Sequence, residues 1–293
     1  MAPLFFIYGE NMKKILITGV STGIGYAAAL RLVKAGHTVY GSVRNEVDAK
    51  RLKSELGENY YPLIFDVTDG SAIKQASEYV AEELGDDKID VLINNSGIAL
   101  GGPILELPLD IFRKQFDVNL FGIISVTQAF SKLLGAYKGA THQGKIIMIS
   151  SVAGKRSYPF VGPYSASKHA LEGMSDALRR ELMLYGIDVV LVEPGPVKTH
   201  IWKKTPDPEN NLFLKSDFEP ALRKFNNMIK RFENDGLDAD IIAKRIEKII
   251  NSKSPKSRYV ISPNKLRDHI LPGLLPDRWL DKAMSKALGL KKR

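Results

Sequence analysis

The chain has 293 residues, of which 44% are hydrophobic and 26% charged, so it can build a sizeable core and is not disordered throughout. It contains no cysteine, which excludes disulfides, thiolate metal sites and cysteine nucleophiles and agrees most simply with a reducing cytoplasm. Forty-two Lys and Arg against 33 Asp and Glu give a net charge of +9. That charge favours an anionic partner, although a solvated basic surface explains it equally well. We expect no metal, and no nucleic acid because no such binding motif is present.

At the amino-terminal end, the stretch MAPLFFIYGENMKK has its lysines after a short apolar run, unlike a signal peptide. No later segment is long and apolar enough to span a bilayer. Residues 1–12 are therefore expected to be an extension outside the fold. Met12 is an alternative natural start, because MKKILITG leads directly into a strand.

Short β-branched runs alternate with longer helical patterns between residues 13 and 265. The seven runs are KILIT (14–18), TVYGSV (38–43), YPLIF (61–65), VLIN (91–94), KIIMIS (145–150), DVVLVE (188–193) and RYVIS (258–262). Such alternation predicts βαβ units and a parallel sheet with helices on both faces. We predict a single α/β domain with a Rossmann-type doubly wound parallel sheet of about seven strands. Its ligand crevice should lie at the carboxyl ends of the strands.

The alternation breaks between residues 197 and 238, where no strand is expected. A segment of this length in a compact fold is usually a functional lid or a disordered stretch. Its apolar content favours a substrate lid, carried by Ile201, Trp202, Leu212, Phe213, Leu214, Phe218, Phe225 and Met228. No motif there names a ligand, but this content favours a bulky lipophilic carbonyl compound as substrate.

The last residues, 266–293, form a basic amphipathic extension. Trp279, Leu280, Ala283, Met284, Ala287 and Leu288 make an apolar helical stripe beside Lys282, Lys286 and the basic tail. The stripe is expected to pack on its own domain or on a partner subunit. The alternative is weak contact with an anionic membrane surface.

A glycine-rich turn, TGVSTGIG, follows the first strand and contains Gly19, Gly23 and Gly25. Glycine at these points permits a tight turn, close approach to a pyrophosphate, and a helix whose first N–H groups face the anion. Ser21 and Ile24 belong to the same turn. Alone the spacing is weak, but its place between a strand and an amphipathic helix predicts a dinucleotide site.

The end of the second strand indicates which dinucleotide is bound. An acidic residue there would bind a free ribose 2′-hydroxyl, but VYGSVRN has no acid before Glu46. Ser42 and Arg44 instead suit a 2′-phosphate, which predicts NADP(H) in preference to NAD(H). The simpler alternative is that Arg44 is a solvated residue at a helix start.

Two further segments are expected in the same crevice. Asp66 and Val67 follow the third strand and suit an adenine amino group and ring, although Asp66 also suits a helix cap. Asn95 and Gly97 belong to NNSG after the fourth strand, which taken alone is a simple turn.

Tyr164 and Lys168 lie four residues apart at the start of a helical pattern, thirteen residues after Ser151. Hydride transfer to a carbonyl needs a proton donor, and a nearby ammonium and an oxidised nicotinamide both favour the phenolate of a tyrosine. The spacing places Lys168 on the face of Tyr164, and Ser151 is placed to bind the substrate oxygen. Each residue alone also suits a surface role; their joint placement predicts catalysis.

The chain resembles the short-chain dehydrogenase/reductase family over residues 13 to about 200. The matching pieces are TGVSTGIG, Asp66, NNSG, Asn119 in FDVNLFG, SSVAG, YSASK and EPGPVKT, in the family's order. The stretch ALRRELMLYGIDVVLVEPGPVKT is similar to the branch of retinol and hydroxysteroid dehydrogenases. One departure is Ser96, which stands where alanine is more usual.

The resemblance implies roles for these residues. Tyr164 is the general acid/base, Lys168 its activator and ribose ligand, and Ser151 the carbonyl binder. Asn119 holds a water of the proton relay. The nicotinamide and pyrophosphate side is lined by Pro194, Gly195, Val197 and Thr199. The resemblance also implies a homodimer or homotetramer, formed through the helices that contain Asn119 and Tyr164.

The function expected is that of an NADPH-dependent carbonyl reductase, reversible as an alcohol dehydrogenase. One alternative is reduction of a carrier-bound 3-oxoacyl thioester, for which the basic surface would dock an acidic carrier. Another is a non-catalytic NADP(H)-sensing protein, which the Ser151, Tyr164 and Lys168 set argues against.

Overall fold

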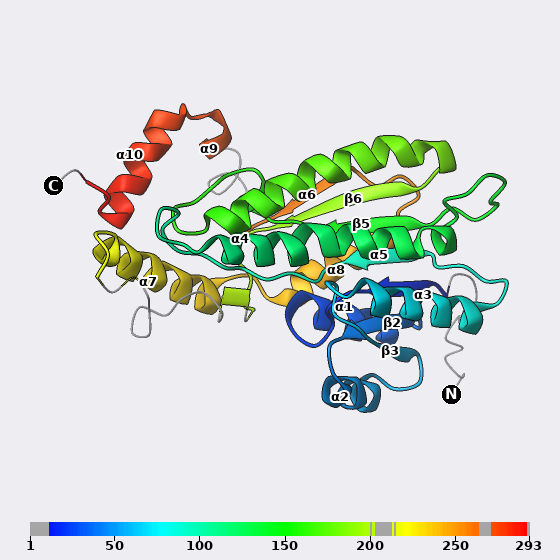
Figure 1. Ribbon diagram of the computed structural model, residues 1–293. Coiled ribbons are helices and arrows are strands. Elements are labelled where there is room, and N and C mark those ends of the chain that lie inside the picture. The colour runs from blue at the N-terminus through cyan, green and yellow to red at the C-terminus, as the bar shows by residue number, and fades with distance from the viewer. Residues whose placement is uncertain (1–11, 200, 203–212, 214, 264–270, 292–293) are drawn as a thin grey trace, which may run out of the picture.

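The computed structural model describes residues 12–199, 201–202, 213, 215–263 and 271–291 (Figure 1). Its strands are β1 (Lys14–Ile17), β2 (Thr38–Val43), β3 (Tyr60–Ile64), β4 (Val91–Asn94), β5 (Lys145–Ile149), β6 (Asp188–Pro194) and β7 (Arg258–Ile261). Its α-helices are α1 (Gly23–Lys34), α2 (Glu46–Leu56), α3 (Gly70–Leu84), α4 (Leu109–Phe116), α5 (Gly122–Phe130), α6 (Gly162–Glu181), α7 (Glu219–Asp235), α8 (Ala239–Ile250), α9 (Leu271–Leu274) and α10 (Asp277–Leu288).

The seven strands form one parallel sheet in the order β3-β2-β1-β4-β5-β6-β7. The predicted doubly wound sheet is therefore confirmed, with strand ends shifted by one or two residues at most. The order reverses between β1 and β4, so the loops that follow these two neighbouring strands diverge. Such a reversal opens a crevice at the carboxyl ends of the strands.

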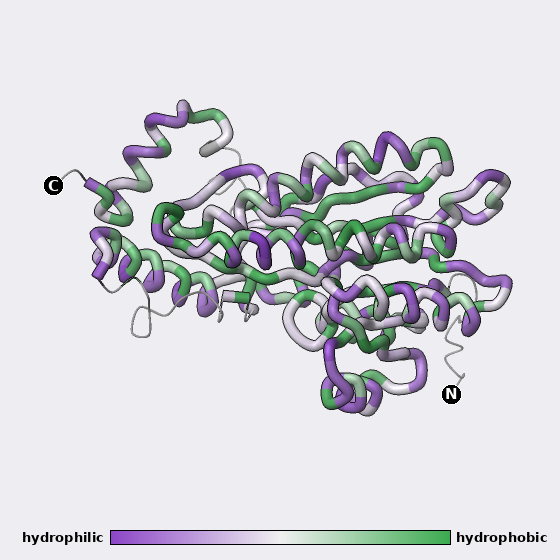
Figure 2. The backbone as a smooth tube through the Cα atoms, in the orientation of Figure 1, coloured by the Kyte–Doolittle hydropathy of each residue, from purple (hydrophilic) through white to green (hydrophobic). Residues whose placement is uncertain are grey.

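Alternate residues of each central strand enter different cores on the two faces of the sheet. In β1, Ile15 and Ile17 pack among α1, α2 and α8, whereas Leu16 packs among α3, α5 and α6. Each of these side chains is fully buried, which contributes about 1.5–3 kcal/mol per residue. Figure 2 shows the resulting hydrophobic strands between helices of mixed polarity. The two-layer cover holds the carboxyl ends of the strands in a rigid frame.

A third apolar cluster lies beyond the carboxyl ends of the strands and is built largely from α7 and the loop before α6. It contains Ile201, Trp202, Phe213, Phe218, Phe225 and Met228 from the predicted lid, whereas Leu212 and Leu214 lie outside the described residues. No strand occurs in the described part of 197–238, apart from one bridge between Val197 and Leu237. The described part of the segment is thus a packed wall; its function as a lid stays a proposal.

Helices α9 and α10 form an arm at one end of the molecule, beside α7 (Figure 1). Leu288 is the one buried residue among those described in α10. The arm therefore packs through its carboxyl-terminal turn, whereas Trp279, Ala283 and Ala287 of the predicted apolar stripe are exposed. No helix in the described part of the chain has the length and apolar character needed to cross a membrane.

Candidate active site

A cavity of about 1030 Å³ opens at the carboxyl ends of the strands. It brings together nearly all the predicted site residues: Gly19, Ser21, Gly23, Ile24, Ser42, Arg44, Asp66, Val67, Asn95, Gly97, Ser151, Tyr164, Lys168, Pro194, Gly195, Val197 and Thr199. Two of the predicted residues, Gly25 and Asn119, do not line the cavity but lie beneath residues that do. Gly25 packs against Gly19 and Asn95, and Asn119 is fully buried against Ile98.

The glycine-rich turn forms one end of the cavity. Gly19 has a φ of +71°, in the left-handed region that favours glycine, and its N–H donates to the Ser42 hydroxyl at 2.9 Å. A methyl group at Gly25 would overlap the carbonyl oxygen of Gly19, so only glycine permits this approach of helix and turn. Thr22 precedes α1 without capping it through its side chain, so the first N–H groups of the helix remain available to an anion. These features fit the phosphates of a dinucleotide.

The segment after β4 is tied to the same turn. The Asn95 side-chain amide donates to the carbonyl oxygens of Thr18 at 2.9 Å and Gly19 at 3.0 Å. The Thr18 hydroxyl accepts from the main-chain N–H groups of Asn95 and Ser96, both at 3.0 Å. NNSG is therefore a brace for the glycine-rich turn as well as part of the cavity lining. The serine at position 96 is accommodated without strain.

The opposite side of the dinucleotide end is formed by residues after β2 and β3. Arg44 is exposed and borders the cavity, and its guanidinium is free to turn toward a 2′-phosphate. The Ser42 oxygen already accepts from Gly19, which leaves its hydroxyl proton for donation. The Asp66 carboxylate accepts from the N–H and hydroxyl of Thr68 at 2.9 and 2.8 Å. Asp69, not Asp66, caps α3.

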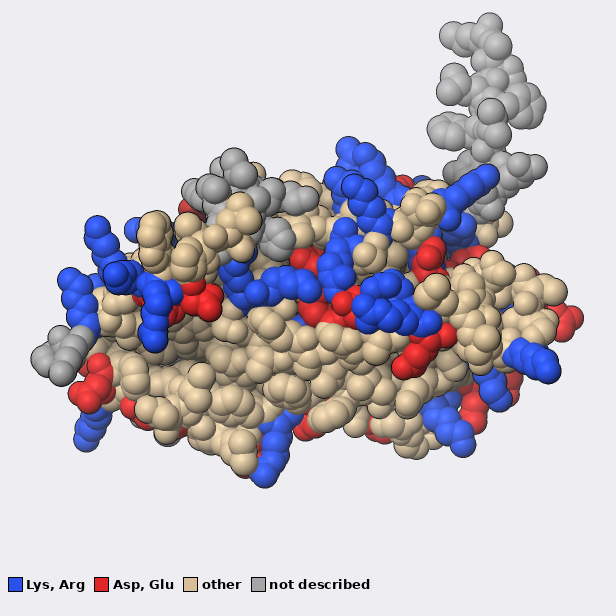
Figure 3. All heavy atoms as spheres, turned by 90° about the horizontal axis from the view of Figure 1, so that it is seen from above, with Lys and Arg blue, Asp and Glu red and all other residues tan. Residues whose placement is uncertain are grey.

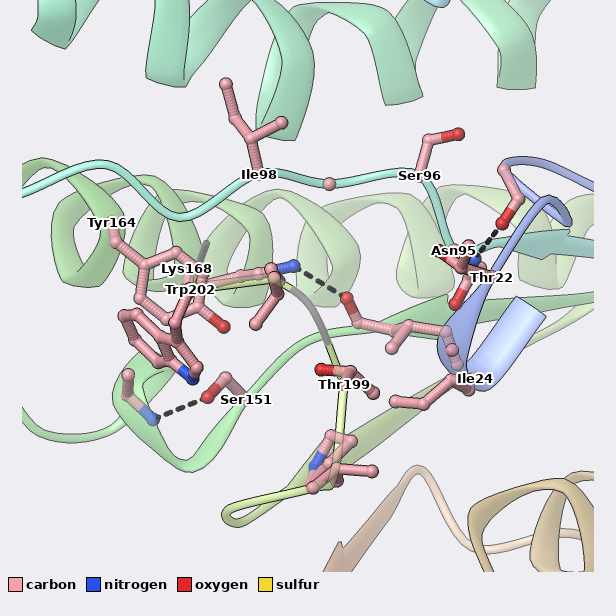
Figure 4. Close-up of a pocket in the computed structure, with 18 of the residues that line it drawn as sticks. Thr22, Ile24, Asn95, Ser96, Ile98, Ser151, Tyr164, Lys168, Thr199 and Trp202 are labelled. Carbon is pink, nitrogen blue, oxygen red and sulfur yellow. Dashed lines mark hydrogen bonds between the residues drawn. The ribbon is translucent and has the colours of Figure 1, made fainter. Parts of the chain in front are cut away.

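Ser151, Tyr164 and Lys168 converge at the other end of the cavity (Figure 4). Ser151 lies two residues after the end of β5, whereas Tyr164 and Lys168 lie one turn apart near the start of α6. The Lys168 ammonium nitrogen lies 5.9 Å from the centre of the Tyr164 ring and donates to the Ile149 carbonyl at 2.8 Å. The predicted i, i+4 pairing on one helix face is thus present in the structure.

Burial dominates the acid–base properties of this group. It raises the pKa of Tyr164, while a hydrogen bond with the Ser151 hydroxyl acts in the opposite direction. Burial also lowers the pKa of Lys168 to about 8, and the charge of Glu172 opposes that change. At neutral pH the phenol is therefore protonated and the lysine is largely cationic. This is the state in which a tyrosine can donate a proton.

Asn119 lies in a π-helical turn, Asp117–Phe121, between α4 and α5. Its side-chain oxygen accepts from the Ile98 N–H at 2.9 Å, and its amide donates to the Ile98 carbonyl at 3.0 Å and the Ser167 hydroxyl at 3.2 Å. Ser167 in turn donates to the carbonyl of Tyr164 at 2.8 Å. The side chain thus connects the segment after β4 to the helix that carries Tyr164.

The cavity wall near Tyr164 is apolar and was only partly anticipated from the sequence. The Trp202 ring meets the Tyr164 ring edge to face, with centres 5.5 Å apart. Residues of the β5–α6 loop and α7 complete the wall, namely Ala153, Tyr158, Val161, Phe225, Met228, Ile229 and Phe232. The amphipathic pattern of residues 219–235 is the signal that would have identified α7 as a wall. The described residues include no cluster of His, Asp and Glu suited to a metal ion.

A cluster of charged side chains around the buried Glu172 of α6 was not anticipated. Glu172, one turn after Lys168, is bonded by Lys155 at 3.0 Å and by Arg258 of β7 at 3.1 Å. Arg258 also meets Asp176 at 2.8 Å, and its hydrogen bond lowers the pKa of that carboxyl to about 2. The cluster ties α6 to the edge of the sheet and places a carboxylate near Lys168.

Comparison with known proteins identifies this architecture. A family model described as "short chain dehydrogenase" matches residues 13–210. The NADPH-dependent 3-dehydrocapnine reductase of Ornithobacterium rhinotracheale is 42% identical over 277 residues, or 94% of this chain and 98% of the relative. The 3-ketodihydrosphingosine reductase of Bacteroides thetaiotaomicron is 34% identical over 252 residues, or 85% and 87% of the two chains.

A crystal structure of a short-chain dehydrogenase from Streptomyces avermitilis has the same fold, with a TM-score of 0.74 at 26% identity. The match covers 95% of this chain and 98% of that one. The chain therefore belongs to the short-chain dehydrogenase/reductase family and is an NAD(P)-dependent oxidoreductase that acts on CH–OH and C=O groups.

Proposed function

We propose that the protein is an NADPH-dependent carbonyl reductase that reduces the ketone of a long-chain lipid to a secondary alcohol, with oxidation as the reverse reaction. The proposal depends above all on the convergence of Ser151, Tyr164 and Lys168 under an apolar wall, in a cavity whose other end is the glycine-rich turn. One cavity thus accommodates a dinucleotide and an apolar substrate side by side.

In this mechanism the bound nicotinamide supplies the hydride for reduction and accepts it in oxidation. Tyr164 donates its phenolic proton to the substrate oxygen, to which the Ser151 hydroxyl also donates a hydrogen bond. The raised pKa of Tyr164 keeps this proton in place until a ketone is bound. Lys168 then stabilises the phenolate that remains and holds the ribose hydroxyls.

Asn119 is assigned two roles, one for its main chain and one for its side chain. Because its side-chain amide is engaged with Ile98 and Ser167, we assign the contact with a relay water to its main-chain carbonyl in the π-helical turn. Its side chain holds the segment after β4 against α6.

The proposed cofactor is NADP(H) in preference to NAD(H). Arg44 borders the cavity at the end of β2, and no acidic side chain precedes it there to bind a ribose 2′-hydroxyl. The relative from Ornithobacterium rhinotracheale is named as NADPH-dependent. Asp66 and Val67 are assigned to the adenine, and Pro194, Gly195, Val197 and Thr199 to the nicotinamide side.

The proposed substrate class follows from the wall around Tyr164. Trp202, Met228 and Phe232 present large apolar surfaces among which a long aliphatic chain fits, although Tyr158, Arg231 and Asp235 also line the cavity. The names of the two relatives describe reduction of 3-dehydrocapnine and of 3-ketodihydrosphingosine. Both names place the reacting oxygen at carbon 3.

We assign the protein to the cytoplasm and to a homodimer or homotetramer.

The test is NADPH and NADH oxidation, followed by absorbance, on ketones that share one head group and differ in chain length, with Arg44→Asp in parallel. We expect a preference for NADPH, a kcat/KM that rises with chain length, and a shift of the variant toward NADH. Turnover of carrier-bound thioesters alone, or NADPH binding without turnover of any carbonyl, would replace this proposal with the thioester reductase or the cofactor sensor.

A further inference from the structure

The outward face of the arm formed by α9 and α10 carries apolar and basic side chains together. Leu274 is 76% exposed, Leu275 40% and Trp279 64%. These three large apolar side chains are thus exposed within six consecutive residues. A tryptophan at the border of an apolar and a charged surface is typical of a membrane interface.

Helical spacing divides α10 into four rows of three residues. One row is polar and consists of Asp277, Asp281 and Ser285, and the Asp281 carboxylate lies 3.6 Å from the Arg278 guanidinium. Leu280, Met284 and Leu288 face the body of the protein, half-buried or buried. Arg278, Lys282 and Lys286 form an exposed basic stripe, and Trp279, Ala283 and Ala287 form an exposed apolar stripe beside it. Figure 3 shows Lys and Arg side chains along the whole of this face, including the end that carries α10, with acidic side chains among them. The arm therefore presents an apolar strip bordered by cations, as an interfacial helix does.

The arm also lies against two elements that line the cavity. Leu288 of α10 joins the apolar cluster of α7, the helix whose inner face lines the cavity through Met228 and Phe232. A methyl group at Gly273 of α9 would lie 2.8 Å from the guanidinium of Arg156, two residues before the cavity residue Tyr158. The arm thus meets both α7 and the loop before α6, which contribute lining residues to the cavity.

We propose that this arm docks the protein on an anionic bilayer surface, so that the mouth of the cavity faces the lipid from which a long-chain ketone is drawn. The inference rests on the proposed function for the nature of the substrate. A bilayer explains both stripes, because acyl chains accept Leu274, Leu275 and Trp279 while anionic head groups accept the basic stripe. A symmetric contact between two copies would bring like charges together.

The first experiment is flotation of the full-length protein with vesicles of phosphatidylcholine, with or without phosphatidylglycerol. We expect binding to the anionic vesicles that weakens as salt is added. The double variant Lys282→Glu with Lys286→Glu should lower binding at least about tenfold. Trp279→Ser should lower it while keeping the charge, which separates the apolar part of the contact from the electrostatic part.

The matched control is Lys132→Glu with Lys138→Glu, which makes the same charge change on exposed side chains at the other end of the molecule. It should bind like the wild type. Equal binding by the arm variants, or none by the wild type, overturns the proposal. So does a wild type that self-associates through the arm without binding vesicles.

The second experiment separates docking from catalysis. The arm variants should reduce a short, water-soluble ketone at the wild-type rate and a vesicle-borne long-chain ketone several-fold more slowly. Equal rates on both substrates contradict the docking role. If no ketone is turned over although anionic vesicles bind, the proposed function fails and the docking surface stands.

Discussion

Among single residues, Tyr164 combines almost complete burial with a partner on each side. Ser151 bonds its hydroxyl, Lys168 lies one helical turn away, and Trp202 packs against its ring. Only the hydroxyl of Tyr164 is needed for proton transfer, whereas the ring is needed for packing. Removal of the oxygen alone should therefore separate chemistry from structure.

Tyr164→Phe is expected to lower kcat/KM for ketone reduction by about 10²–10⁴-fold, the usual contribution of a general acid. NADPH affinity, measured by calorimetry, and the melting temperature should change little because the ring remains. Near-normal turnover by this variant would mean that the proton comes from another group.

Glu172 should change the pKa of Lys168 without contacting the substrate. Its negative charge raises the pKa of Lys168 against the effect of burial, so Glu172→Gln lowers that pKa further below about 8. In the proposed mechanism the cationic lysine is the active form. The loss of activity with rising pH should therefore begin at a lower pH in the variant than in the wild type. The measurement is the pH profile of kcat.

Asp176→Asn is the control for this shift. It also loses a contact with Arg258, at 2.8 Å, but lies one turn further along α6 from Lys168. Its pH profile should match the wild type. A Glu172→Gln profile that also matches would show that the cluster serves structure alone.

At the scale of elements, the glycine-rich turn and α6 each contain a glycine, but the space around the two glycines differs. Gly25 lies where α1 meets the turn, and added atoms would strike Gly19 and Asn95. Gly173 lies on the exposed side of α6 with no neighbour within 4 Å of an added methyl. The same substitution should thus have opposite effects at the two sites.

Gly25→Ala is expected to destabilise the protein by about 1–3 kcal/mol through overpacking and to abolish NADPH binding. Gly173→Ala should instead stabilise it by about 0.5–1 kcal/mol, because glycine is unfavourable in a helix interior. Thermal unfolding with and without NADPH measures both effects. Retained NADPH binding by Gly25→Ala would show that the turn adapts.

The elements differ in how far the sequence predicts them. Strands such as Lys145–Ile149 are short β-branched runs, and the Tyr164–Lys168 spacing is local, so both were predictable. The π-helical turn around Asn119 has no local signature, because the chain around it continues as helix on both sides. The contact of Glu172 with Arg258 spans 86 residues, and only the β6–β7 pairing brings them together.

At the scale of the whole molecule, the proposed oligomer should use the helices of the face that carries α5 and α6. Phe121, in the π-helical turn before α5, is 55% exposed, which is costly for so large an apolar side chain in water. Much of the surface in Figure 3 carries no charged side chain.

Light scattering is expected to give twice or four times the chain mass of 32.5 kDa. Phe121→Arg should shift the protein toward the monomer, because a buried unpaired charge is unfavourable in an apolar interface. Val47→Arg, at a 78% exposed position on α2, is the control and should leave the mass unchanged. A dimer that persists in Phe121→Arg would place the interface elsewhere.

The chain has two tryptophans, and the fold sets them in contrasting surroundings. Trp202 packs on Tyr164 within the cavity, whereas Trp279 stands on the exposed arm. Excited indole at position 202 should pass energy to a reduced nicotinamide beside it, while iodide in solution should quench position 279. The protein therefore carries one intrinsic fluorophore in the cavity and another on the arm, and fluorescence can follow both in one sample without a label.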